Sequence, residues 1–168
     1  CRLQQQRPKL HVLLAGHDGT AYGVPRSDGL GWAEWAKQSV PLDPNRTHWL
    51  GSLQDLEYRQ VLACSDVHLY LTVPFILSWS LLEAMAVGAA IVASDTPPVQ
   101  EVLNHQRSAL LVDFFDVDAQ VSALTTILDQ AALRRSLGVE AQRQAQKYSH
   151  SKGSLAWSEI LRRAAAPL

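Results

Sequence analysis

The sequence has 168 residues, which is enough for one domain with a full hydrophobic core. Its net charge of −1 argues against a surface that binds nucleic acid or anionic membranes. Its two cysteines, Cys1 and Cys64, make neither a disulfide framework nor a metal site, so a reducing, cytoplasmic compartment is expected.

The sequence was also searched for membrane-spanning, signal and repeated segments. No apolar run reaches the length of a transmembrane segment, and no basic-then-apolar signal segment opens the sequence. Because the first residue is Cys1 and not Met, we expect a piece of a longer protein. No internal repeat or low-complexity run divides it, so residues 1–168 are predicted to form a single domain.

Apolar runs alternate with helical patterns along the whole chain. The runs, at residues 10–15, 47–50, 67–71, 89–93 and 109–112, are expected to form strands, and the near-continuous ones are typical of buried parallel strands. Helices are predicted at residues 31–40, 54–63, 80–87, 99–104, 117–129, 131–148 and 150–166. This alternation predicts an α/β fold with a Rossmann-like, doubly wound parallel sheet.

The stretch from residue 66 to residue 96 holds two of these strands with a short helix between them, the pattern of a right-handed crossover unit. Ligands of such sheets bind beyond the carboxyl ends of the strands, where a helix N-terminus offers free N–H groups and partial positive charge. The loop at Ser78, Trp79, Ser80 and Leu81 occupies such a position and is predicted to bind a ligand.

Glu83 is the single acid of that apolar helix, and two interpretations are open. The spacing of Ser80 and Glu83 is that of a capping box, in which each side chain satisfies a backbone donor of the other and Glu83 binds no ligand. Alternatively, the carboxylate beside this serine-rich turn binds a ligand. The spacing by itself favours the cap.

Common signatures of chemical sites are absent. The chain has no phosphate loop ending in Gly-Lys-Ser/Thr, no glycine-rich dinucleotide fingerprint and no Gly-x-Ser-x-Gly elbow. The six histidines have no metal-ligand spacing, and no aspartate pair suggests a divalent ion, so no metal site is predicted.

Turns that end two other strands contain glycine. Gly16 allows a tight turn and a close backbone approach to a ligand, and Gly51 with Leu53 has the same position after the next strand. Each turn has two interpretations, a plain turn or a contact with a ligand. Trp79 is either a wall of the ligand site or a core aromatic, and the core is favoured.

Residues 77–88, Leu-Ser-Trp-Ser-Leu-Leu-Glu-Ala-Met-Ala-Val-Gly, with residues 91–96 and 99–102 after them, resemble the signature of the family 4 glycosyltransferases of the GT-B fold, or glycosyl transferases group 1. Residues 46–51 resemble that family's strand and glycine before the base-binding loop, and residues 109–116 resemble a later strand. The likeness extends over nearly the whole chain from Pro8.

The resemblance implies one half of a two-domain enzyme, the C-terminal half that binds a UDP- or GDP-linked sugar. It implies retaining transfer of a hexosyl group to a glycan or lipid-linked acceptor in polysaccharide biosynthesis. No cofactor is expected, and the lack of ligand spacing noted above predicts no metal. The acceptor, and any peripheral contact with a membrane, would belong to a further N-terminal domain.

The resemblance also implies roles for single residues. Glu83 matches the second glutamate of the family's Glu-x7-Glu pair, which holds the ribose hydroxyls, and vicinal hydroxyls suit a carboxylate acceptor. The loop from Ser78 to Leu81 would offer backbone N–H groups to the diphosphate. By their position after strands, Gly51 and Leu53 would lie beside the nucleobase, and Gly16 would face the crevice.

The chain departs from the family pattern in ways that keep alternatives open. Phe75 stands where the first glutamate contacts the transferred sugar, so no catalytic residue is assigned, and Phe75 is predicted to pack under the loop. No Arg or Lys matches the cations that neutralise the diphosphate. The alternatives are a GT-B nucleotide-sugar epimerase and a non-catalytic module that binds a nucleotide sugar or a protein partner.

Overall fold

The computed structural model describes residues 2–20 and 24–165 and divides into two compact units, residues 1–61 and 62–168, each treated by itself below. All strand pairs of the described ranges are parallel, and helices alternate with the strands, so the predicted α/β class with parallel strands is confirmed. Cys1 and Ala166, the last residue of the predicted C-terminal helix, lie outside the described residues. The single domain over 1–168 stays a prediction.

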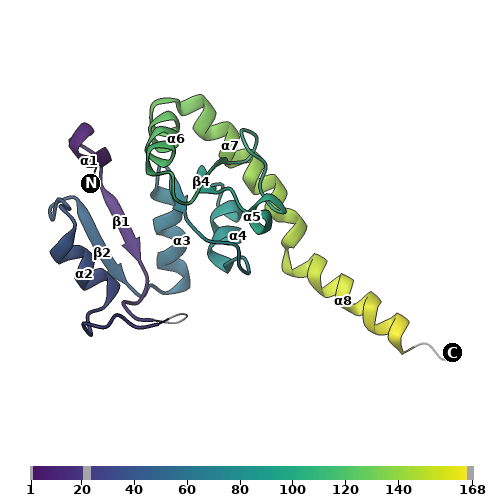
Figure 1. The fold of residues 1–168 in the computed structure, drawn as a ribbon. Helices are drawn as coiled ribbons and strands as arrows, with labels where there is room; N and C mark the ends of the chain where they lie inside the picture. Colours follow the sequence, from purple (N-terminus) through teal and green to yellow (C-terminus); the bar gives the residue numbers. More distant parts are fainter. Residues whose placement is uncertain (1, 21–23, 166–168) are drawn as a thin grey trace. The chain divides into compact units, whose positions relative to one another are not determined.

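The first unit contains a two-stranded parallel sheet and short helices (Figure 1). Its elements are α1 (Arg2–Gln6), β1 (Val12–Ala15), α2 (Trp32–Ser39) and β2 (Thr47–Gly51), and α3 (Asp55–Cys64) begins in it. Beside the strand ladder, His11 Nδ1 and His48 Nε2 lie 2.8 Å apart and share a hydrogen bond between stacked rings. These two histidines therefore join the strands to each other.

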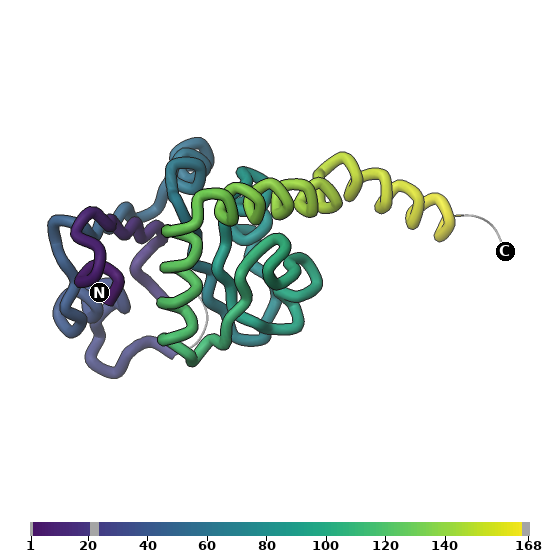
Figure 2. The backbone as a smooth tube through the Cα atoms, turned by 90° about the horizontal axis from the view of Figure 1, so that it is seen from above, coloured from purple at the N-terminus to yellow at the C-terminus, as the bar shows by residue number. Residues whose placement is uncertain are grey.

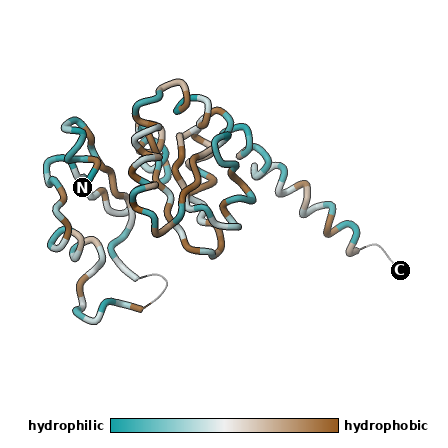
Figure 3. The backbone as a smooth tube through the Cα atoms, turned by 45° about the horizontal axis from the view of Figure 1, so that its top comes forward, coloured by the Kyte–Doolittle hydropathy of each residue, from teal (hydrophilic) through white to brown (hydrophobic). Residues whose placement is uncertain are grey.

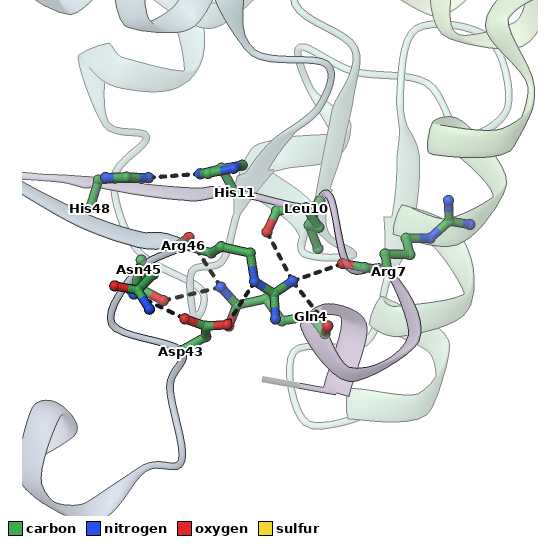
Figure 4. A network of polar contacts seen from close by, with 9 residues as sticks. Gln4, Arg7, Leu10, His11, Asp43, Asn45, Arg46 and His48 are labelled. Atoms are coloured by element: carbon green, nitrogen blue, oxygen red, sulfur yellow. Dashed lines mark hydrogen bonds and ion pairs between the residues drawn. The ribbon is translucent and has the colours of Figure 1, made fainter.

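Arg46 connects α1 to β2 through polar contacts (Figure 4). Its Nη1 donates to the backbone oxygens of Gln4 at 3.1 Å and Arg7 at 2.9 Å, and its Nε donates to Asp43 Oδ2 at 2.7 Å. The Arg46 guanidinium holds the pKa of Asp43 below its ordinary value. The buried Gln4 donates from Nε2 to Arg46 O and to Thr47 Oγ1, both at 3.1 Å. These hydrogen bonds therefore hold α1 against the start of β2.

The second unit is organised on a three-stranded parallel sheet in the order β3 (His68–Tyr70), β4 (Ile91–Ser94), β5 (Leu110–Val112). The central strand β4 is buried along its whole length. The helix α4 (Trp79–Ala86) connects β3 to β4, and α5 (Pro97–Gln100) lies between β4 and β5 in the chain. The strand–helix–strand unit that was predicted at residues 66–96 is thus present.

Helices complete the second unit after β5. They are α6 (Val117–Asp129), α7 (Ala131–Ala145), the 3-10 turn η1 (Gln146–Tyr148) and α8 (His150–Ala164). Figure 2 shows how the chain runs on from α7 through η1 into α8. The helix α6 packs on β4 and β5, and α7 packs on α4 and α6. In Figure 3 the hydrophobic colour gathers on the inner strands, while α7 is largely hydrophilic, as a covering helix should be.

The backbones of α7 and of the turn after α4 meet in direct contact at two glycines. Gly88 ends α4 with φ +77°, a left-handed conformation that favours glycine. A Cβ atom added to Gly138 would lie only 2.2 Å from the Gly88 carbonyl oxygen. Gln142 Nε2 donates to Ala86 O at 3.0 Å one turn further along α7. These contacts fix α7 against the C-terminal end of α4.

The five predicted strands are observed, β1 and β2 paired in the first unit and β3, β4 and β5 paired in the second. The burial of some of them differs from the prediction. The strand at residues 10–15 was predicted to be buried, yet Leu13 and Leu14 are each 37% exposed, and Leu69 of β3 is 41% exposed. Burial of a parallel strand needs neighbours on both edges and cover on both faces. In the described ranges β1 pairs with β2 alone, and β3 pairs with β4 alone.

Several predicted helix ends differ from the observed ones. The helix predicted at 99–104 is α5 at Pro97–Gln100, because Pro97 occupies the first helical position, where no N–H is needed. The helix predicted at 131–148 divides into α7 and η1. The helix predicted at 80–87 begins one residue earlier, at Trp79, and this shift matters for Glu83.

Candidate functional site

The N-terminus of α4 is organised by Ser78. This residue has an extended backbone, and its Oγ accepts a hydrogen bond from the Ser80 N–H at 3.2 Å, so Ser78 is the N-cap. The Ser78 N–H donates to the Tyr70 hydroxyl at 3.1 Å, which ties the cap to β3. The fully buried Leu81 anchors the first turn of α4 in the core. The end of β3 and the core therefore place the start of α4 together.

Three of the four amides predicted to meet a ligand already have partners. The N–H groups of Ser78 and Ser80 donate as described, and the Leu81 N–H donates to Ser78 O at 3.1 Å. The helix dipole still places partial positive charge at this end of α4. An anion here is therefore favoured by the dipole, and within the described residues the Trp79 N–H has no partner and is available for direct contact. The Ser80 N–H could contact an anion only after it leaves the Ser78 hydroxyl.

Glu83 is not part of a capping box. Because Ser78 is the cap and Ser80 lies inside the first turn, the predicted reciprocal pair of Ser80 and Glu83 is wrong. Within residues 2–20 and 24–165, the Glu83 carboxylate has neither a hydrogen bond nor an ion pair, although the residue is half-buried. A half-buried carboxylate with unused acceptors is suited to a ligand that brings hydroxyl donors.

A groove of about 580 Å³ runs between α4 and the end of α7. One side is a stripe of α4 with the spacing of a single helix face, Trp79, Leu82, Glu83 and Ala86. The other side comes from α7, η1 and the next residue, and it consists of Gln142, Ala145, Gln146, Tyr148 and Ser149. Glu83 is the one charged residue among those that line the groove, so the groove itself supplies no cation for a phosphate.

Two aromatic residues near the start of α4 are on the surface, contrary to expectation. Trp79 was expected in the core but is 80% exposed, because the first position of α4 points away from the buried stripe of Leu81, Ala84 and Met85. Phe75 was predicted to pack under the loop but is 59% exposed. Trp79 is therefore available as a wall of the groove.

The glycine turns of the first unit lie together. The Gly16 N–H donates to Gly51 O at 2.8 Å at the carboxyl ends of β1 and β2, and both glycines have positive φ, at 139° and 64°. A Cβ atom added to either glycine would meet no atom within 4 Å, so backbone approach there is unobstructed. Leu53 follows β2 and is half-buried. Ligand contact at Gly16, Gly51 and Leu53 stays a prediction.

Asp18, in the turn after β1, has a structural role. Its carboxylate accepts from the N–H groups of Ala33 at 2.9 Å and Glu34 at 3.3 Å, so it caps α2 from the preceding loop. Gly31 is required beside it, because a Cβ there would lie 2.2 Å from Asp18 Oδ2. Asp18 in this turn therefore has a structural role, because it caps α2.

Sequence reasoning missed the far side of the groove. Tyr148, Gln146 and Gln142 lie some 60 residues after Glu83 in the chain, and only the packing of α7 on α4 brings them to it. No motif marks them. In the part of the chain that the structure describes, no group of three or more His, Cys, Asp or Glu side chains could hold a metal ion. Among the described helices, none combines the length and the apolar composition that a membrane-spanning segment needs.

A family model described as glycosyl transferases group 1 matches residues 2–130. A comparison with curated protein sequences finds no match.

Comparison with solved structures gives similar folds. The Anabaena protein HepE in complex with UDP-glucose is 21% identical with a TM-score of 0.81, over 96% of this chain and 43% of that one. Sucrose-phosphate synthase from Thermosynechococcus elongatus is 23% identical with a TM-score of 0.78, over 98% of this chain and 41% of that one. The chain thus spans about two fifths of the length of these proteins. At these identities the likeness shows a shared fold.

Proposed function

The chain belongs to the glycosyl transferases of group 1, and we propose that it is the part of a transferase that binds the nucleotide-sugar donor, UDP- or GDP-linked. The proposal extends to retaining transfer of a hexosyl group to a glycan or lipid-linked acceptor, in polysaccharide biosynthesis in the cytoplasm. The acceptor would be bound by a further domain.

The Glu83 carboxylate carries this proposal. It is half-buried in the groove, it takes no part in capping, and it has no partner within the described ranges. Vicinal ribose hydroxyls can both donate to one carboxylate. The N-terminus of α4, one turn away, favours the charge of a diphosphate. HepE, a protein of similar fold, is solved with UDP and with UDP-glucose, which supports the choice of ligand.

The direct test is the affinity of the protein for UDP and GDP, measured by calorimetry on wild type and Glu83→Gln. Charge-assisted hydrogen bonds contribute about 1.5–3 kcal/mol each, and an amide accepts them more weakly. We expect binding of the preferred nucleotide to weaken at least about tenfold, which is about 1.4 kcal/mol. The melting temperature should stay unchanged, because Glu83 supports no cap.

Two controls isolate the ribose contact. Glu101→Gln removes one negative charge from an exposed position outside the groove and should leave affinity unchanged. A 2′,3′-dideoxy nucleotide offers no hydroxyls, so wild type and Glu83→Gln should bind it alike. If Glu83→Gln binds the ordinary nucleotide as tightly as wild type, the assignment of the donor site to Glu83 is withdrawn.

The proposal also concerns whether residues 1–168 can transfer sugar alone and whether transfer needs a metal. We expect residues 1–168 to transfer no sugar alone, because the groove has no cation for the diphosphate and no acceptor site is assigned to this chain. We also expect transfer by the longer protein to persist in a chelator. Transfer by the isolated chain, or activity lost in chelator and restored by magnesium or manganese, would contradict these two expectations.

A further inference from the structure

The groove beside Glu83 is held open by specific contacts. Gly138 meets the Gly88 carbonyl without room for a side chain, and Gln142 donates to Ala86 O. Both contacts lie at the C-terminal end of α4. The residues that follow on α7 and η1 consequently line the same groove as Trp79 and Glu83 of α4.

Tyr148 is the aromatic member of this far side. It belongs to η1, it is 48% exposed, and within the described residues its hydroxyl has no hydrogen-bond partner. Tyrosine is an apolar platform with a polar tip, and its ring packs on the faces of bases and sugars. Gln146 beside it, also on the groove, offers an amide with both donor and acceptor atoms.

The composition of the groove matches a nucleoside. It combines one carboxylate, two amide side chains and two accessible aromatic rings in about 580 Å³, within the range of about 300–1,000 Å³ that is usual for small-molecule sites. The phosphates of a nucleotide in this groove would extend toward the N-terminus of α4.

We propose that Tyr148 is a further donor-binding residue, which packs its ring against the nucleoside whose ribose Glu83 holds. The inference rests on the proposed function, since it takes the groove as the seat of the nucleotide. It adds a contact from the segment after α7, so that the donor bridges the two walls of the groove.

The test is calorimetry with UDP and GDP on Tyr148→Phe, Tyr148→Leu and Tyr148→Ala. Phe keeps the ring and should bind like wild type within about twofold. Leu keeps an apolar side chain without a ring, so Tyr148→Leu should bind the preferred nucleotide at least about fivefold more weakly than wild type. Tyr148→Ala should bind it at least as weakly as Tyr148→Leu. Trp157→Ala, an exposed aromatic on α8 outside the groove, is the control and should change nothing. Melting temperatures separate binding from folding.

The outcomes separate this inference from the proposed function. If Glu83→Gln weakens binding but Tyr148→Leu binds like wild type, Tyr148 is not a donor residue and the function stands. If Tyr148→Leu binds weakly and melts like wild type, the inference is supported. If Glu83→Gln binds like wild type, the groove is not the nucleotide site and both proposals fail. If Tyr148→Phe is as weak as Tyr148→Leu, the ring contact is overturned.

Discussion

The sheets of the two units differ in how far they bury strands that look alike in sequence. The strand β4 is fully buried between β3 and β5, whereas most of β1, which pairs with β2, is exposed. Both contain apolar runs of the kind that predicts a buried parallel strand. In the first unit hydrogen bonds of Arg46 and Gln4 hold the elements, and in the second unit close apolar packing does so. An apolar run therefore shows that burial is favourable, but the neighbours decide whether it happens.

Truncation of matched strand residues gives the largest expected difference. Ile91→Ala in β4 removes a side chain that is 0% exposed, and it should lower the free energy of unfolding by about 3–4 kcal/mol. Leu13→Ala in β1 removes a side chain that already meets solvent and should cost about 1 kcal/mol. Urea unfolding followed by circular dichroism measures both. Equal losses would remove the distinction between the two sheets.

The contact of α7 with the turn after α4 gives the next largest effect. Gly138→Ala places a Cβ against the Gly88 carbonyl, which cannot move without shifting α4, so a loss of about 2 kcal/mol is expected. Gly153→Ala on α8 is the matched control, because nothing lies within 4 Å of its Cβ. That change should raise stability by up to about 1 kcal/mol through helix propensity. A harmless Gly138→Ala would show that α7 is not fixed at this point.

The polar organisation of the first unit is tested at Arg46. Arg46→Met keeps much of the apolar stem but leaves the backbone oxygens of Gln4 and Arg7 without their donor. We expect a loss of about 1–2 kcal/mol, measured by urea unfolding. Arg59→Met on the exposed face of α3 removes only a surface ion pair with Asp55 and should change stability little. If both variants unfold alike, the Arg46 contacts do not hold the unit.

The smallest expected effect is a pH dependence from His68 on β3. Burial lowers the pKa of His68, and its Nε2 has no hydrogen-bond partner within the described residues. Below about pH 6.5 the unfolded chain takes up a proton that the folded chain resists, so stability falls as pH falls toward the folded pKa. We expect the urea midpoint to drop between pH 7.5 and pH 5.5, and to drop less in His68→Leu. An identical drop in the variant would assign the pH dependence to other groups.

The candidate site, like the strands, depends partly on local sequence patterns and partly on contacts between distant segments. Ser78, Trp79 and Glu83 could be selected from sequence because a helix start, a strand end and a family signature coincide there. The capping assignment failed by two residues, because either Ser78 or Ser80 can cap a helix and spacing does not decide between them. In the structure Ser78 is the cap, and its N–H also donates a hydrogen bond to the Tyr70 hydroxyl. Tyr148 and Gln146 could not be predicted, because no local pattern marks their approach to α4.

The α/β class, the positions of the five strands, the crossover unit around α4 and the family could all be predicted from the sequence. These follow from hydrophobic period and from short signatures, which act over a few residues. The sequence does not reveal which strands are buried, which serine caps α4, where Trp79 points or which residues share the groove with Glu83. Those properties depend on contacts between segments far apart in the chain, such as the one between Gly88 and Gly138, where the absence of a side chain allows two backbones to touch.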